Sequence, residues 1–255
     1  FMEGILKLIE QSSIELSNNQ LCIWLSSGRR DEDYLGFIPA MSFFVLGFKD
    51  MVIEMSSPDV SSPLQEELNV HCQEDSEHWK WFLGDLRRLR YFPVENGEFS
   101  VSALEVIWNE ESYATRDLVY TAMYYIKMHQ EPIYRLVLIE LLEAAFAVFI
   151  AAMKKGALDD FHYRELMYFG KNHVEKELSH ERGSWVENQR AYHENKSLHV
   201  KIGAEARLSM ELMIQDLVKK FDLAFTDWYS RRYAFRREGL KLIAQKRDST
   251  AIMAG

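Results

Sequence analysis

Apolar residues recur along most of this chain three and four positions apart, which is the period of an amphipathic helix. The pattern predicts helices over residues 3–18, 34–56, 63–90, 102–108, 111–129, 132–155, 159–181 and 203–245. We find no strict alternation of apolar and polar residues of the kind that marks a half-buried strand. The sequence therefore predicts an all-α protein whose residues 1–255 form a single helical bundle of seven to nine helices.

Two predicted helix ends carry clear sequence signals. Ser62 followed by Pro63 fits a helix start, because proline is tolerated at the first helical position. Lys154 and Lys155 followed by Gly156 fit a helix end. The whole chain has only 12 Gly and 5 Pro, which favours long helices with few breaks.

Charge and cysteine content narrow the function classes. The formal net charge is −9 and no strong basic cluster is present, which argues against nucleic-acid binding. Cys22 and Cys72 are too few for a disulfide framework and indicate reduced thiols. No leader pattern opens the sequence, and the longest apolar run, 144–153, is too short to span a membrane. We expect a cytoplasmic protein that acts on a small molecule, with no membrane partner and with a homodimer left open.

Two runs of the form H-x-x-x-[D/E]-x-x-H carry the strongest chemical signal. Their members are His71, Asp75 and His78 in the first run, and His173, Glu177 and His180 in the second. On a helix, positions i, i+4 and i+7 share one face. Two such faces inside a bundle would offer imidazoles and carboxylates to a pair of metal ions, and this donor mixture suits non-haem iron, with manganese next. The alternative is that both runs lie on solvated surface helices.

A further carboxylate is expected from the apolar run around residues 136–150. Glu140 and Glu143 interrupt this run, and a buried carboxylate without a partner costs several kcal/mol. One of them is therefore expected to bind a metal, and the small residues around Glu143 favour that position. The alternative partner is a cation such as Arg135 or a lysine.

The motifs resemble those of a known family. The run from His71 to Leu86, HCQEDSEHWKWFLGDL, is similar to the metal-binding helix of the haem-oxygenase-like diiron oxidases and oxygenases. HVEKELSH at 173–180 resembles their second signature, and the Leu-Glu-Ala segment at 142–144 resembles their middle carboxylate helix. The resemblance implies a haem-oxygenase-like bundle that binds two iron ions, without haem, and uses dioxygen as co-substrate.

The same resemblance implies a set of metal ligands. These are Asp75, His78, Glu140 or Glu143, His173, Glu177 and His180. His71 is expected either as a further ligand or as a residue that hydrogen-bonds to one. Asp75 stands where many relatives have Glu, and Glu177 where many have Asp, so the branch of the family stays open.

The resemblance also implies an oxidoreductase of specialised biosynthesis. The expected reaction is dioxygen-dependent oxidation of a small amino-acid-derived metabolite, by C–C cleavage, N-oxygenation or nitrile formation, without a side-chain nucleophile. Alternatives are oxidative decarboxylation of a fatty acid, a metal-free relative with a nucleophilic cysteine, and a non-catalytic binding module.

The substrate pocket is predicted from aromatic and cationic side chains. Trp79, Phe44 and Tyr124 are candidates for its walls, and Arg116 or Arg135 for binding a substrate carboxylate. The alternative for the aromatic residues is an ordinary helical core, because every helix of a bundle buries an apolar stripe.

Overall fold

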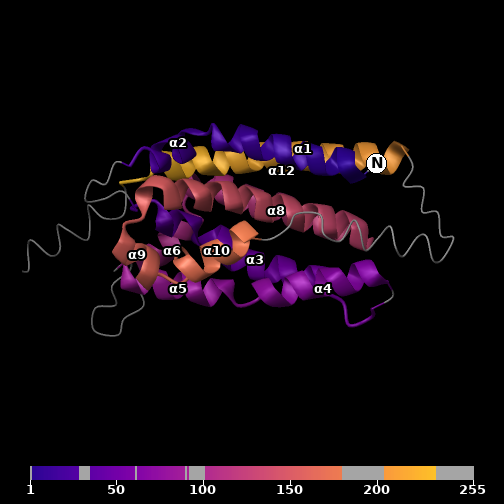
Figure 1. Cartoon of the computed structure of the whole chain (residues 1–255), viewed down its shortest axis with the longest axis horizontal. Helices are drawn as coiled ribbons and strands as arrows, with labels where there is room; N and C mark the ends of the chain where they lie inside the picture. The colour runs from indigo at the N-terminus through magenta and orange to yellow at the C-terminus, as the bar shows by residue number, and fades with distance from the viewer. Residues whose placement is uncertain are drawn as a thin grey trace, which may run out of the picture.

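A computed structural model describes residues 2–28, 35–60, 62–89, 91, 101–179 and 204–233. Within these residues the protein consists of helices packed side by side, without a β-strand (Figure 1). The predicted all-α fold is therefore confirmed. The described residues hold more helices than the seven to nine expected, because α2 was missed and two predicted helices are each broken in two.

The helices follow one another along the chain with short connections. They are α1 (Met2–Ser17), α2 (Gln20–Ser26), α3 (Ser42–Met55), α4 (Pro63–Asp75), α5 (His78–Arg88), α6 (Val101–Trp108), α7 (Tyr113–Met128), α8 (Pro132–Ala152), α9 (Asp160–Glu165), α10 (Lys171–Ser179) and α12 (Ala204–Ser230). Short 3₁₀ turns occupy Ile38–Met41 and Glu110–Ser112, and a π-helical turn, Met153–Ala157, follows α8.

Helix α8 is the central element of the bundle. It packs against α1 and α12 on one side and against α4 and α10 on the other (Figure 1). The segment Pro132–Ala157 is long and apolar enough to cross a membrane, but 78% of its most apolar window is buried inside the protein. Such burial is typical of the central helix of a bundle, which is apolar on all sides because other helices surround it.

The predicted start of α4 is confirmed, whereas the predicted end at Lys154, Lys155 and Gly156 is wrong, because α8 ends at Ala152 and these residues form part of a π-helical turn. The Ser62 side chain accepts the Gln65 N–H at 3.2 Å and caps α4, directly before Pro63. Gly156 lies inside the π-helical turn after α8, at a point where another backbone segment approaches closely: a Cβ on Gly156 would lie 2.4 Å from the Leu25 carbonyl oxygen. Gly156 thus allows α2 to pack onto the end of α8.

The helix predicted over residues 63–90 is broken, which corrects the first motif. Asp75 is the last residue of α4 and His78 is the first residue of α5. The Ser76 hydroxyl between them donates to the Gln73 carbonyl at 2.8 Å, a local bond of the kind that competes with helix continuation. His71, Asp75 and His78 therefore do not form one stripe on a single helix, although α4 and α5 lie end to end (Figure 1).

The helix predicted over residues 159–181 is also broken. It consists of α9 and α10, joined by the connection 166–170. A Cβ on Gly170 would lie 1.6 Å from the Leu166 carbonyl oxygen, so the chain doubles back here in a way that other residues would block. The Asp159 side chain caps α9 by accepting the His162 N–H at 2.7 Å.

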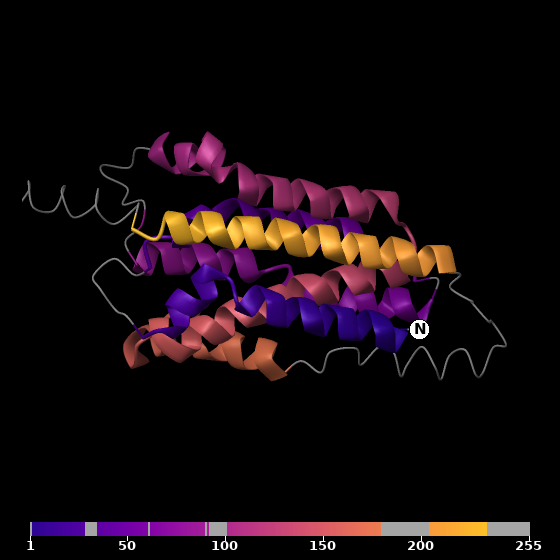
Figure 2. The same ribbon diagram turned by 90° about the horizontal axis from the view of Figure 1, so that it is seen from above.

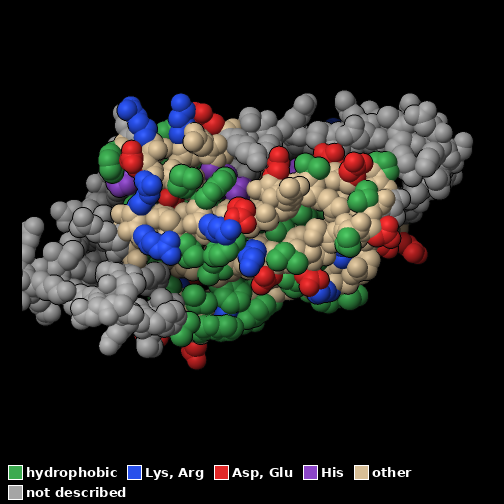
Figure 3. Space-filling model, turned by 90° about the horizontal axis from the view of Figure 1, so that it is seen from below, with side chains coloured by type: hydrophobic (Ala, Val, Ile, Leu, Met, Phe, Trp, Pro, Cys, Tyr) green, Lys and Arg blue, Asp and Glu red, His purple; other side chains and the backbone are tan. Residues whose placement is uncertain are grey.

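Seen from above, α7 lies along one edge of the molecule and α9 and α10 lie along the opposite edge, with α12 running across the middle of the view (Figure 2). On the face seen from below, Lys and Arg side chains are interspersed with Asp and Glu, and hydrophobic side chains gather along the lower edge of the view (Figure 3).

Candidate metal centre

A small cavity of about 30 Å³ lies where α3, α4, α5, α8 and α10 meet. Its size suits water molecules or ions rather than a whole substrate. Four of the predicted metal ligands line it, together with mainly apolar and aromatic side chains. The lining residues are Phe44, Val45, Phe48, Lys49, Asp75, His78, Trp79, Leu142, Glu143, Phe146, Tyr168 and His173.

The break between α4 and α5 places Asp75 beside His78. Asp75 Oδ1 lies 3.5 Å from His78 Nδ1, and both residues are buried. His173 comes from α10, and its ring centroid lies 4.2 Å from that of His78. The structure thus brings together one carboxylate and two imidazoles from three different helices, although the predicted first stripe does not exist.

Glu143 lines the same cavity from α8, and its carboxylate is hydrogen-bonded to His71. The His71 Nδ1 lies 3.2 Å from Glu143 Oε1. The hydrogen bond to Glu143, reinforced by the charges of Glu143, Glu140 and Asp75, raises the pKa of His71 to about 9 despite its burial. His71 is therefore protonated at neutral pH and donates to Glu143, so it fixes the position of this predicted ligand.

The structure separates the two glutamate candidates. Glu143 lines the cavity, whereas Glu140, one turn earlier on α8, does not, although it is buried with 3% of its surface exposed. The negative charge of Glu140 is one of the charges that raise the pKa of His71.

The second motif is described in part. Glu177 lies one turn after His173 in α10, but its side chain and the whole of His180 lie outside the described residues. Among the side chains that the structure describes, no group of three or more His, Cys, Asp or Glu is close enough to hold a metal ion. The donor set nevertheless fits iron in kind, because Asp75, His78, Glu143 and His173 offer two imidazoles and two carboxylates to one cavity.

Two of the predicted pocket residues reach the cavity and three do not. Phe44 and Trp79 line it. Tyr124 is 56% exposed on α7, so it belongs to the surface. Arg116 donates to the Ile107 and Asn109 carbonyls, and Arg135 donates to three carbonyls, those of Met55, Ile126 and His129. Both arginines therefore stabilise backbone away from the cavity.

Lys49 is a site residue that sequence reasoning missed. It lines the cavity from α3, and its Nζ lies 5.2 Å from the centroid of the Trp79 ring. The signal was its helical register, because Lys49 follows Phe44, Val45 and Phe48 on one face of α3. Close packing against α7 holds this helix in place, since a Cβ on Gly47 would lie 2.8 Å from a methyl carbon of Val119.

The two cysteines have the character of buried structural thiols. Burial raises the pKa of Cys22 and that of Cys72 to about 12 each. Both thiols are therefore protonated at neutral pH, and neither lines the cavity. Nothing here favours the metal-free alternative with a nucleophilic cysteine.

Comparisons with known proteins add no family to this description. No protein-family model matches the chain, and a search of curated proteins found no match.

Proposed function

We propose that this protein is a non-haem diiron enzyme that uses dioxygen to oxidise a small amino-acid-derived metabolite. The observation that carries the proposal is the convergence of α4, α5, α8 and α10 on one buried cavity. There they present Asp75, His78, Glu143 and His173. The resemblance of the motifs to the haem-oxygenase-like diiron enzymes supports the same assignment.

The charge of the cavity supports a bound cation. Asp75 is 6% exposed, and Glu143 has a side chain that is 12% exposed, so both carboxylates lie largely out of water. Buried carboxylates need a cation or a set of hydrogen bonds to offset their lost hydration. Among the lining residues that the structure describes, Lys49 is the one Lys or Arg side chain. Protonated His71 also pairs with Glu143, and a metal ion would add positive charge to this group of acids.

The surrounding residues are suited to hold and orient the ligands. His71 donates to Glu143, and His173 Nδ1 donates to the Tyr168 carbonyl at 2.6 Å. Partners of this kind fix the orientation of metal ligands. Bound iron(II) would supply the electrons for reduction of dioxygen, while Leu142 and Phe146 keep bulk water out of the cavity.

Lys49 gives the proposed substrate an anchor. Its ammonium group lies beside Trp79, and both side chains are partly exposed, so a substrate too large for the cavity would lie outside it with its carboxylate paired to Lys49 and an apolar part against Trp79. An amino acid and a fatty acid both carry such a carboxylate. The substrate screen should therefore include both classes.

The test is anaerobic reconstitution with iron(II), followed by exposure to oxygen while optical and Mössbauer spectra are recorded. We expect about two iron ions per chain, as in the bundle sites of di-iron carboxylate proteins. Oxygen should then convert ferrous to ferric spectra, and an accepted substrate should accelerate oxygen consumption.

The matched variants are His173→Ala, which removes a proposed ligand, and His129→Ala, which removes a histidine that stacks on Tyr134 away from the cavity. Iron binding should be lost in the first variant and kept in the second. Equal iron content in both variants, or no iron binding by the helical wild-type protein, would contradict the proposed function.

A further inference from the structure

Asp85 is a buried carboxylate that belongs to no predicted ligand set. It lies in α5 with 0% of its surface exposed. Its Oδ1 accepts the Met167 N–H at 2.7 Å, and its Oδ2 accepts the N–H groups of Tyr168 and Phe169 at 2.8 and 3.1 Å. One side chain thus binds three successive amides of the connection between α9 and α10.

This connection also holds His173. The Tyr168 carbonyl oxygen lies 2.6 Å from His173 Nδ1. A carbonyl oxygen only accepts hydrogen bonds, so Nδ1 carries the hydrogen and the lone pair of the neutral ring is on Nε2. Asp85 binds the N–H of Tyr168, and the carbonyl of the same residue fixes the Nδ1–H tautomer of His173. In that tautomer Nε2 is the atom that can bind a metal.

Helix α5 carries both His78, which lines the cavity, and Asp85. His78 and Asp85 are seven residues apart and share one face of the helix. Phe82 lies between them, and its ring packs against those of Tyr168 and Phe169 at centroid distances of 5.4 and 6.1 Å. The same helix face therefore carries His78 and fixes the segment that orients His173.

We infer that Asp85 is a positioning residue for the metal centre. By binding the amides of Met167, Tyr168 and Phe169, it fixes the Tyr168 carbonyl and, through it, the orientation and tautomer of His173. The consequence for metal binding rests on the proposed function, whereas the consequence for the tautomer is a property of the metal-free protein.

The test compares Asp85→Asn with Asp159→Asn. Asparagine keeps the size of the side chain but replaces one acceptor oxygen with a donor group, so it cannot accept all three amides. Asp159 is the matched control, because it accepts the backbone N–H of His162 outside the connection 166–170. The first readout is the tautomer of His173 in metal-free protein, from long-range ¹H–¹⁵N spectra assigned with His173→Gln.

We expect the Nδ1–H tautomer of His173 in the wild-type protein and in Asp159→Asn. In Asp85→Asn the Nε2–H tautomer should become populated, and iron(II) affinity should fall about 10- to 100-fold, the range typical of residues that orient metal ligands. A purely structural role would lower stability in both variants without changing the tautomer in either.

Measurements on the wild type keep the inference testable where Asp85→Asn fails to fold. The amides of Met167, Tyr168 and Phe169 should then be strongly protected from hydrogen exchange, and His173 should carry its hydrogen on Nδ1. Rapid exchange of these amides, or the Nε2–H tautomer in the wild type, would overturn the inference. A changed tautomer in Asp85→Asn, in a protein that binds no iron, would uphold the positioning role and refute the proposed function.

Discussion

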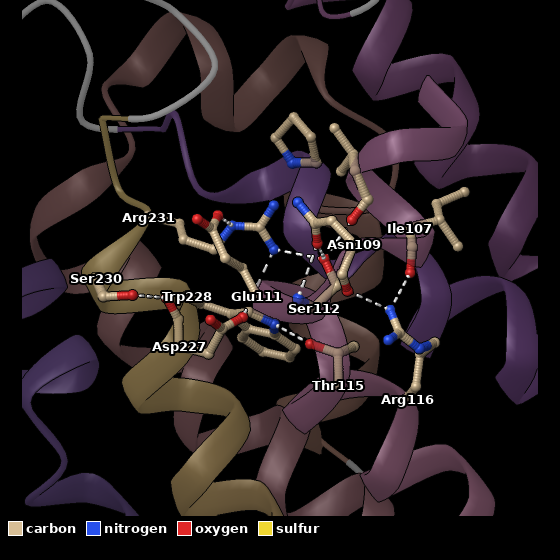
Figure 4. Close-up of polar contacts among 12 residues, drawn as sticks. Ile107, Asn109, Glu111, Ser112, Thr115, Arg116, Asp227, Trp228, Ser230 and Arg231 are labelled. Atoms are coloured by element: carbon tan, nitrogen blue, oxygen red, sulfur yellow. Dashed lines mark hydrogen bonds and ion pairs between the residues drawn. The ribbon is translucent and has the colours of Figure 1, made fainter. Parts of the chain in front are cut away.

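Two buried polar regions of this bundle differ in how their charges are balanced. The candidate metal centre lies between α4, α5, α8 and α10. The second region, which we call the Arg231 cluster, joins the end of α12 to the start of α7. It comprises Glu111, Ser112, Thr115, Asp227, Trp228 and Arg231 (Figure 4).

The Arg231 cluster contains its own cation. Arg231 is 6% exposed, donates to the Ser112 hydroxyl at 2.7 Å and lies 3.7 Å from an Asp227 oxygen. Beside it, Trp228 Nε1 donates to the Thr115 hydroxyl at 2.9 Å (Figure 4). The polar groups of the Arg231 cluster therefore bind one another.

The candidate metal centre is balanced differently. The charges of Asp75, Glu140 and Glu143 act together on His71 and raise its pKa. Lys49 is the one Lys or Arg among the lining residues that the structure describes. The comparison separates a buried acid that has an arginine beside it from a group of acids that has histidines beside it, and the second arrangement is the one on which the proposed metal site rests.

The largest predicted effect is a loss of stability when the Arg231 cluster loses its cation. Arg231→Met should lower the free energy of unfolding by about 3–5 kcal/mol, because it leaves the Asp227 carboxyl buried without its arginine. Urea unfolding measures this loss. Arg207→Met is the control, since Arg207 pairs with Glu211 on the surface and should change stability by less than about 1 kcal/mol. Similar losses in the two variants would contradict the distinction.

The next effect concerns the candidate metal centre and the stability that iron(II) should add to it. Iron(II) at a hundred times its dissociation constant should stabilise the protein by about 2.7 kcal/mol, because a ligand that binds the folded state shifts the unfolding equilibrium. Anaerobic thermal unfolding measures this gain. Arg231→Met should keep the iron-dependent gain, whereas His78→Ala should lose it. An unchanged melting temperature with iron would argue against a cation-binding site.

A pH effect of similar or smaller size is expected in the Arg231 cluster. Burial raises the pKa of Asp227 from 3.8 to about 6, against the opposing effect of Arg231. The folded state therefore binds this proton more tightly than the unfolded state. The resulting contribution to stability is complete below about pH 4 and is lost as the pH rises through 6, with a size on the order of 2–3 kcal/mol.

Asp227→Asn should remove this part of the pH dependence, which urea unfolding between pH 4 and 7 would measure. Asp59→Asn is the control at an exposed carboxylate and should leave the profile unchanged. A profile for Asp227→Asn that matches the wild type would show that Asp227 does not titrate in this range.

The smallest effect concerns the proposed substrate anchor. Lys49→Met should raise the KM for a carboxylate substrate about tenfold, equivalent to about 1.4 kcal/mol, while iron content stays the same. Lys127→Met is the control, because Lys127 pairs with Glu54 on the surface. Equal KM values in the two variants would remove Lys49 from the substrate site.

The sequence predicted the presence of helices better than the places where they break. Apolar periodicity found α1, α3, α7 and α8 because each buries a long stripe. Periodicity gave no sign of the break at Ser76, which depends on local hydrogen bonding, or of the break before Gly170, which depends on close backbone contact.

The candidate site shows the same limit. His78 and His173 were found because histidine at helical spacing with acids is a chemical pattern. The sequence left Glu140 and Glu143 as alternatives, since both interrupt the same apolar run, and tertiary packing places Glu143 at the cavity. Asp85 lies in the quoted run 71–86 without a predicted role, and its role comes from its contacts with the connection before α10. Lys49 gains its significance from its place at the cavity, which is a matter of tertiary packing.

The most direct test of the metal centre is a crystal structure of the iron-loaded protein with anomalous diffraction at the iron edge. The account predicts anomalous peaks in the cavity, within bonding distance of Asp75, His78, Glu143 and His173. Iron-loaded crystals with an empty cavity, or with anomalous peaks at other positions, would contradict it.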